Sequence, residues 1–140
     1  CKFDWSLKSY PFICIHLVRS FLRMCHLGKW TDALQHCESA GGQLVSISSP
    51  DVQATVSQAL GGSARSGNAW IGLRQSVCTG RWYWLSEESL AFTRWAAGEP
   101  SLRYENKCAG VSLEPQRNFT WSAENCCAAR PFVCYFYTQY

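Results

Sequence analysis

Nine cysteines in 140 residues restrict the fold of this chain more than any other feature of its sequence. Such a density is typical of small proteins that disulfides stabilise in an oxidising compartment, and no Cys-x2-Cys spacing indicates a zinc site instead. Because the count is odd, at least one cysteine must be free or bound to another chain. The cysteines therefore predict an extracellular, disulfide-stapled protein, secreted or part of a membrane protein's ectodomain. They also allow a disulfide-linked or non-covalent dimer.

Length and composition predict one globular domain over residues 1–140. With 47% hydrophobic residues, the chain can bury a sizeable core. Its net charge of +3 is too small to predict a nucleic-acid partner. The apolar run over residues 12–22 is short and contains His16 and Arg19, so we expect no transmembrane segment.

Two aromatic runs, residues 69–73 and 81–85, predict a β-hairpin around which the other elements pack. Trp70 is expected in the core because its strand should lie in the middle of the sheet. In contrast, residues 19–28 are expected to be irregular. Further strands are predicted at residues 11–18, 44–47, 108–113, 119–121 and 131–137.

Two amphipathic patterns predict helices between these strands. Trp30, Ala33, Leu34 and Cys37 fall on one helical stripe, which should end at Gly41-Gly42. The second helix should begin at Ser49-Pro50-Asp51, where a capping residue precedes proline at the first helical position.

The order of these elements and several motifs resemble the C-type lectin-like domain, from about residue 11 to residue 137. This resemblance implies an α+β fold of two helices, antiparallel sheets and a long loop region. The similarity is greatest to mannose-receptor and phospholipase-A2-receptor type domains, and weaker to eosinophil major basic protein and fish type II antifreeze proteins. Residues 1–14 then form either an N-terminal hairpin extension or the end of a preceding tandem domain. The motifs are Gly42-x-Leu44-x-x-Ile47, Trp70-Ile71-Gly72-Leu73, Trp82-x-Trp84, Gly98-Glu99-Pro100, Trp121-x4-Cys126 and Pro131-Phe132-Val133-Cys134.

The resemblance also implies the disulfide framework. Cys37 should pair with Cys134, and Cys108 should pair with Cys126 rather than Cys127. Cys1 with Cys14 resembles the N-terminal bridge of longer family members. The pairing of Cys25, Cys78 and Cys127 stays open.

Calcium-binding members of the family carry Glu-Pro-Asn or Gln-Pro-Asp, a glutamate two residues before the next cysteine, and Trp-Asn-Asp. Here Glu99-Pro100 is followed by Ser101, and Asn106 stands where the glutamate belongs. Trp121 is followed by Ser122 and Ala123, and an alanine side chain offers no oxygen to calcium. We therefore expect no cofactor and no metal. The alternative metal set is Glu99, Glu105 and Asn106.

The chain lacks the motifs of nucleophilic or phosphate chemistry, so we expect no enzymatic activity. The resemblance implies an extracellular recognition module, of the kind used in immune recognition, that binds a protein or glycan without calcium. A calcium-dependent lectin with an irregular site is one alternative, and a structural or surface-active, antifreeze-like protein is another. Asn118-Phe119-Thr120 is a glycosylation acceptor on a predicted turn. The expected ligand-binding residues are Glu99, Ser101, Arg103, Tyr104, Glu105, Asn106 and Ser122.

Overall fold

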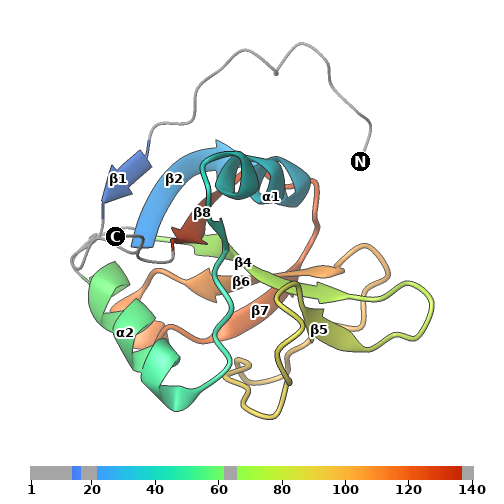
Figure 1. The fold of residues 1–140 in the computed structure, drawn as a ribbon. Coiled ribbons are helices and arrows are strands. Elements are labelled where there is room, and N and C mark those ends of the chain that lie inside the picture. Colours follow the sequence, from blue (N-terminus) through green and yellow to red (C-terminus); the bar gives the residue numbers. More distant parts are fainter. Residues whose placement is uncertain (1–13, 17–21, 62–65, 137–140) are drawn as a thin grey trace.

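The computed structural model describes residues 14–16, 22–61 and 66–136 (Figure 1). Its helices are α1 (Trp30–Ser39) and α2 (Pro50–Gly61), with a short 3-10 turn η2 (Pro115–Arg117). Its strands are β1 (Cys14–His16), β2 (Leu22–Gly28), β3 (Gln43–Leu44), β4 (Asn68–Gln75), β5 (Trp82–Trp84), β6 (Cys108–Ser112), β7 (Trp121–Glu124) and β8 (Arg130–Tyr135). The predicted α+β class is thus confirmed.

One mixed sheet runs through the described residues in the order β1-β2-β8-β4-β6-β7. The strand β3 pairs with β8, and β5 pairs with β4. Trp70 lies opposite Phe132 where β4 and β8 run parallel, whereas the other strand pairs are antiparallel. The β4–β5 pairing confirms the predicted hairpin. It also places β4 in the sheet interior, between β8 and β6.

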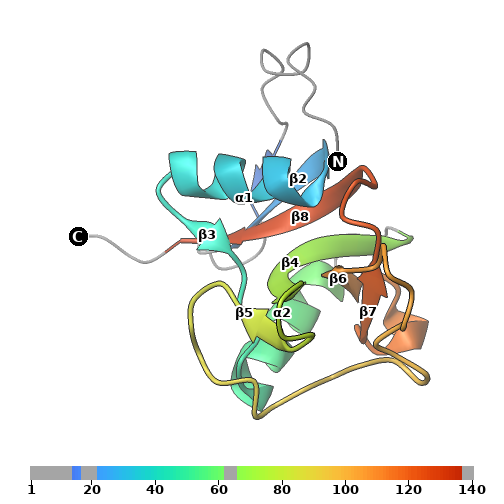
Figure 2. The same ribbon diagram turned by 90° about the vertical axis from the view of Figure 1, so that its right-hand side faces the viewer.

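The two faces of β4 pack against different helices, which lie on opposite sides of the sheet (Figure 2). Ile71 and its neighbours on one face join a core that includes Val56 and Leu60 of α2. Trp70, on the other face, joins Ala33 and Cys37 of α1. Alternate side chains of a strand point to opposite faces, so the unbroken apolar run of β4 is explained by burial on both sides.

Buried tryptophans connect these layers through their indole N–H groups. Trp30 of α1 donates to the carbonyl of Ile71 in β4 at 2.9 Å, and Trp70 of β4 donates to that of Gly28 in β2 at 3.0 Å. Trp121 of β7 donates to Gln53 Oε1 of α2 at 3.0 Å. Each bond satisfies a polar group that burial would otherwise leave unpaired.

The sequence-based assignment of residues 19–28 as irregular is wrong for most of that segment. Residues 22–28 form β2, which pairs with both β1 and β8. The register of β2 shifts between Cys25 and Gly28, and Leu27 there has a φ of 45°. This irregularity breaks the alternation of β2 after Met24 and concealed the strand from the alternation rule.

Other elements follow their predictions with shifted ends. Both helices are confirmed, and α2 begins at Pro50 as expected. The strand expected at residues 44–47 is only β3, and the one expected at 119–121 is instead β7. Asn118 and Phe119 have φ values of 55° and 52°, a turn conformation that prevents an earlier start of β7. Of the strand expected at residues 11–18, the described part is β1.

Two predicted disulfides are confirmed, Cys37–Cys134 and Cys108–Cys126. The first joins α1 to β8, and the second closes the segment that contains β6 and β7. Cys25 and Cys127 are also disulfide-bonded, whereas Cys78 is free and exposed. The predicted Cys1–Cys14 bridge includes a cysteine that lies outside the described residues.

Candidate functional site

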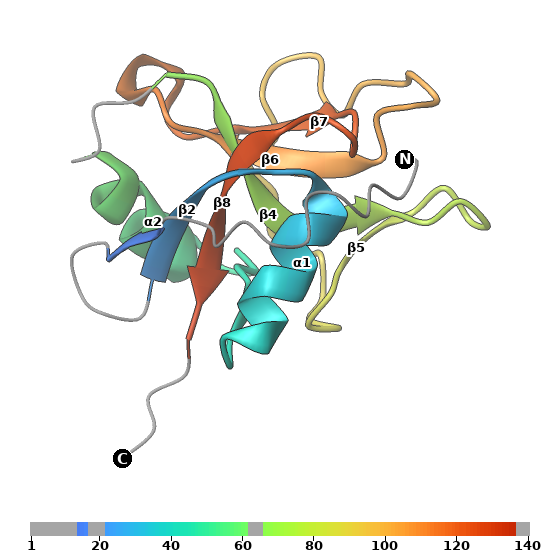
Figure 3. The same ribbon diagram turned by 90° about the horizontal axis from the view of Figure 1, so that it is seen from above.

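Residues 85–107, between β5 and β6, carry most of the candidate ligand-binding residues. Figure 3 shows the later part of this segment, gold to orange, beyond β6 and β7 on the side away from α1. Its first half is fixed to the edge strand β7, because Trp121 N donates to Arg94 O and Ala96 N donates to Trp121 O, both at 2.8 Å. The Trp95 ring packs edge-on against Trp82 and Trp121. The loop is therefore anchored on the sheet by its backbone and by an aromatic side chain.

The second half of the loop is closed by its own polar groups. Ser101 Oγ accepts hydrogen bonds from Arg103 N at 3.3 Å and from Asn106 Nδ2 at 3.4 Å. Asn106 N also donates to the carbonyl of Arg103 at 3.1 Å. Asn106 thus directs its amide nitrogen, a donor and not a metal ligand, toward Ser101.

Glu99 lies at the base of this loop, before a cis peptide bond to Pro100. Its Oε2 atom is buried and has no hydrogen-bond partner in the described residues. The negative charge of Glu99 contributes to a raised pKa of the Glu124 carboxyl in β7.

Glu124 is a site residue that the sequence analysis missed. It forms an ion pair with Arg130 at 2.9 Å. Burial raises the pKa of the Glu124 carboxyl above its ordinary value; Arg130 and Asn68 oppose this rise, and Glu99 adds to it. The alternation of β7, with Trp121 and Ala123 buried and Ser122 and Glu124 on the other face, was the signal that could have identified it.

Ser122 is held by β4, which β6 separates from β7 in the sheet, and not by the loop. Asn68 Nδ2 of β4 donates to Ser122 Oγ at 2.9 Å. Glu99 and Ser122 both lie in the region where the loop meets β7, whereas Glu105 is exposed further along the loop. In the described part of the chain, no group of three or more His, Cys, Asp or Glu side chains is placed to hold a metal ion. The donor set of this region, with Asn68 and Asn106 amides directed at the two serines, does not fit a calcium site.

The loop tip carries the exposed candidates. Leu102 is 100% exposed and Tyr104 is 81% exposed, and Arg103 between them is exposed as well. The Lys107 ammonium lies 5.0 Å from the centroid of the Tyr104 ring, a cation–π arrangement. The tip therefore presents apolar, aromatic and cationic groups directly to solvent.

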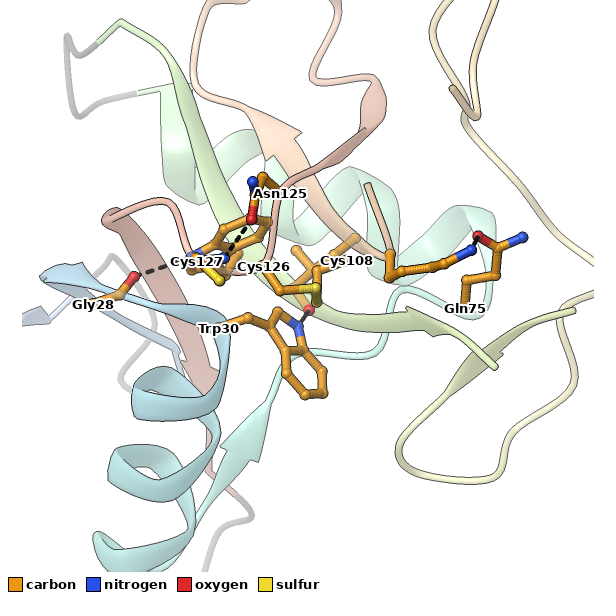
Figure 4. Close-up of a disulfide and its surroundings, with 10 residues drawn as sticks. Gly28, Trp30, Gln75, Cys108, Asn125, Cys126 and Cys127 are labelled. Atoms are coloured by element: carbon orange, nitrogen blue, oxygen red, sulfur yellow. Dashed lines mark hydrogen bonds between the residues drawn. A yellow bond between two sulfur atoms is a disulfide. The ribbon is translucent and has the colours of Figure 1, made fainter. Parts of the chain in front are cut away.

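Gln75 connects this tip to the β4–β5 hairpin. Its Oε1 accepts from Lys107 Nζ at 3.3 Å, and its Nε2 donates to Gly80 O at 2.7 Å. Figure 4 shows Gln75 in the surroundings of the Cys108–Cys126 disulfide. The hairpin loop adds the exposed residues Val77 and Arg81 to the same region. The Cys108–Cys126 disulfide fixes the base of β6 directly after the tip. We call the exposed groups of the two loops, Val77, Arg81, Leu102, Arg103 and Tyr104, the tip surface.

Asn118, the predicted glycosylation acceptor, is exposed in the turn between β6 and β7. The backbone there adopts the left-handed conformation, which asparagine tolerates better than most residues. The hydroxyl of Thr120 donates to the carbonyl of Arg117 at 2.9 Å. The acceptor motif is thus accessible on the surface, as the sequence predicted.

Comparisons with known proteins agree with this architecture. The profile of the Lectin C-type domain family matches residues 27–136. The C-type lectin lectoxin-Lio1 of Erythrolamprus poecilogyrus is 34% identical over 138 residues, which cover 96% of this chain and 78% of that protein. The C-type mannose receptor 2 of Rattus norvegicus is 34% identical over 111 residues, 79% of this chain but 7% of the receptor.

The fold is also similar to a solved structure, and the sequence to a relative that this chain covers only in part. Human lithostathine superposes with a TM-score of 0.74 at 25% identity, covering 84% of this chain and 92% of that one. The C-type lectin lectoxin-Lio3 of Erythrolamprus poecilogyrus is 29% identical over 107 residues. The matched region covers 75% of this chain and 66% of that protein. Among the described residues, no helix is long and apolar enough to cross a membrane. The chain belongs to the C-type lectin domain family.

Proposed function

We propose that this domain binds a protein or glycan ligand through the tip surface and that it does so without calcium. Domains of the C-type lectin family act in recognition and are not enzymes, so a ligand-binding role follows from the family itself. We further propose that the domain works outside the cell, because its disulfides require an oxidising compartment.

The observation that carries the proposal is the exposure of the tip. Tyrosine and arginine are enriched where protein surfaces bind partners, and a fully exposed leucine contributes nothing to the core. The described residues contain two ion pairs, Arg117–Glu114 and Arg130–Glu124, and neither includes a cation of the tip surface. Arg81 and Arg103 therefore keep their charges for a ligand, and we expect that ligand to carry acidic groups.

The absence of a calcium role rests on the donor set at the base of the loop. Calcium prefers six to eight oxygens that include several carboxylates. Here Ser101 and Asn106 bond to one another, and Ser122 is engaged by Asn68. The one observation that favours a calcium-dependent alternative is the buried, unpartnered Oε2 of Glu99.

Thermal unfolding with calcium or with a chelator distinguishes calcium-independent binding from the calcium-dependent alternative. A ligand that binds only the folded state must raise the melting temperature. With a dissociation constant of about 1 mM or weaker, 1 mM calcium would add at most about 0.4 kcal/mol, so we expect nearly coincident melting curves. A rise of several degrees in calcium would contradict the proposal. As a positive control, the combined variant Ser101→Asn, Asn106→Glu, Ser122→Asn and Ala123→Asp should gain calcium protection.

A binding experiment tests the tip surface itself. The wild-type domain, applied in chelator to immobilised glycans and to a panel of cell surfaces, should bind, and the Arg103→Ala/Tyr104→Ala variant should lose at least tenfold in affinity. Leu27→Ala is the matched control, because Leu27 is 64% exposed but lies in β2, on the far side of β8 from β4. Binding that requires calcium, or that the tip variant leaves unchanged, would contradict the proposal.

A further inference from the structure

The β4–β5 hairpin presents part of one face to solvent on the α1 side of the sheet. Leu85 packs against the core on the α1 side, whereas Trp82 and Trp84 belong to the core on the opposite side. Because side chains alternate along a strand, Tyr83 and Arg81 lie on the same face as Leu85. Tyr83 is 43% exposed and Arg81 is exposed, so α1 does not cover this part of the face. Figure 3 shows the hairpin projecting beyond α1.

Arg74 of β4 completes this group of side chains. The register of the hairpin places Arg74 directly opposite Tyr83, and the bond of 2.9 Å from Ser76 N to Arg81 O continues that register toward the turn. Arg74 and Arg81 are therefore diagonal neighbours on one face, a relation that places side chains roughly 7–8 Å apart. We call Arg74, Arg81 and Tyr83 the hairpin face.

The Arg74 side chain is held in place but has no counter-ion. Its guanidinium lies 4.9 Å from the centroid of the Trp30 ring, at the first residue of α1. This stacking covers one face of the guanidinium and uses none of its five N–H donors. Asp32, the acid in the first turn of α1, accepts from Lys29 N at 3.2 Å, and it forms no ion pair with Arg74 in the described part of the chain. Arg74 is thus a half-buried, positioned cation whose donors stay available.

The other two groups of the hairpin face are also unused by the protein. Among the described residues, neither the Arg81 guanidinium nor the Tyr83 hydroxyl has a hydrogen-bond or ion-pair partner. The sequence from Val52 to Ser86 contains no acidic residue, so the hairpin's own segment supplies no compensating charge. A face with two available guanidiniums and one available hydroxyl is complementary to an anionic ligand.

We propose that the hairpin face binds an extended acidic segment of a partner protein, with carboxylates at two alternate positions. Such side chains point to the same side of an extended chain and lie about 6.6–6.8 Å apart. This spacing is close to that of diagonal neighbours on a sheet, so each carboxylate meets one guanidinium. Because Trp30 holds Arg74 in place, a partner that spans the two arginines fits better than a small anion on which both must converge.

This inference deepens the function proposed above and rests on it, because it names an acidic protein segment as the ligand. It adds Arg74 and Tyr83 to the binding residues, and Arg81 belongs to both surfaces. Variants at unshared residues distinguish the two surfaces, at Arg74 for the hairpin face and at Arg103 and Tyr104 for the tip surface.

The probe is a five-residue peptide with blocked ends, Thr-Glu-Thr-Glu-Thr, titrated to about 10 mM into the disulfide-bonded, ¹⁵N-labelled protein in chelator at low salt. Saturable shifts are expected in the Nε–H signals of Arg74 and Arg81 and in the indole N–H signal of Trp30. The isomer Thr-Thr-Glu-Glu-Thr has the same charge, but its adjacent carboxylates point to opposite sides of an extended chain. It should bind about tenfold more weakly because it loses one charge-assisted contact, and so should inorganic phosphate.

Variants then assign the peptide to the hairpin face. Arg74→Gln should weaken binding by at least about tenfold, and Tyr83→Phe by a smaller factor because it removes a single hydroxyl. Since Arg74 packs on Trp30, Arg81→Gln provides a second test at an exposed position, with the same expected loss. The matched control is Arg94→Gln, an exposed arginine outside the hairpin that also lacks an ion pair in the described residues.

The proposal is overturned if the two peptide isomers bind equally, since charge alone would then suffice, or if phosphate binds as tightly as the peptide. It is also overturned if Arg74→Gln or Arg81→Gln binds like Arg94→Gln. Peptide binding lost in Arg103→Ala/Tyr104→Ala but kept in Arg74→Gln would assign the acidic segment to the tip surface, so the proposed function would stand and this inference would fail. The opposite pattern supports the hairpin face, whatever the tip variant does with glycans and cell surfaces.

Discussion

Trp70 shows how one side chain stabilises this fold through both its ring and its N–H group. It is 0% exposed, and its indole donates to Gly28 O of β2 across the intervening β8. Trp70→Ala should lower the free energy of unfolding by about 3–5 kcal/mol, the cost of a large cavity. Trp70→Phe should cost about 1–3 kcal/mol because it leaves a buried carbonyl unpaired.

Urea unfolding followed by circular dichroism measures both variants. Trp82→Phe is the control, because Trp82 is only half-buried and its indole makes no hydrogen bond in the described residues. If the Trp70 variants lost ligand binding but kept the stability of wild type, Trp70 would belong to a ligand-binding site and not to the core.

Glu124 makes the stability of the fold depend on pH in an unusual direction. Its pKa is raised in the folded state, so the folded chain binds this proton more tightly than the unfolded chain does. Between the raised pKa and the ordinary value of 4.5, its contribution to the free energy of unfolding therefore increases as the pH falls. Arg130 and Asn68 lower its pKa and Glu99 raises it, and Arg130 is its ion-pair partner.

The variant Glu124→Gln should remove this dependence. Near neutral pH, the free energy of unfolding of this variant should be larger relative to wild type than it is at lower pH. The difference should shrink as the pH falls toward about 4.5. Urea titrations at several pH values measure the difference, with Glu38→Gln, an exposed acid of α1, as the control. A difference that stays constant over this range would show that the carboxyl titrates as it does in the unfolded chain.

At the residue scale, sequence reasoning succeeded where a side chain's role depends on its own motif. Trp70 and the choice of Cys126 over Cys127 are examples, and both are confirmed. It failed for Glu124 and Arg130, which are six residues apart in sequence and meet only because β7 and β8 are placed by other strands. The alternation of β7 could have placed Glu124 on the less buried face, but its pairing with Arg130 is set by tertiary register and leaves no local signal.

At the scale of elements, the helices were predicted well because a cap, a proline and a periodic apolar face are all local signals. The strand β2 was missed because its main partner, β8, follows it by about a hundred residues and its own alternation is interrupted near Leu27. A long loop region was expected, yet the closure of residues 98–107 around Ser101 could not be derived from composition.

At the scale of the whole molecule, the two confirmed disulfides should differ in their effect on stability. Cys37–Cys134 spans 97 residues in sequence and Cys108–Cys126 spans 18. In the chain-entropy model, closing a loop of about 100 residues contributes about 4.7 kcal/mol, and a loop near 15 residues about 3 kcal/mol. The double variant Cys37→Ala/Cys134→Ala should therefore unfold at lower urea concentration than Cys108→Ala/Cys126→Ala.

Non-reducing urea titrations of both double variants measure this, and Cys78→Ser, which removes the free thiol, is the control that should behave as wild type. The reverse order of stabilities would mean that packing around Cys108 outweighs the entropy of the longer loop.

The position of β8 also determines when this protein can fold. A ribosome delivers β2, β4, β6 and β7 before β8, yet β8 lies between β2 and β4 in the finished sheet. Before β8 is synthesised, no strand joins β2 to β4. Cys37 also lacks its disulfide partner, Cys134 of β8. Contacts of such long sequence separation are slow to form and expose apolar strands meanwhile. Closure of the sheet therefore waits until β8 has been synthesised, and the cell must keep the earlier strands of this domain soluble until then.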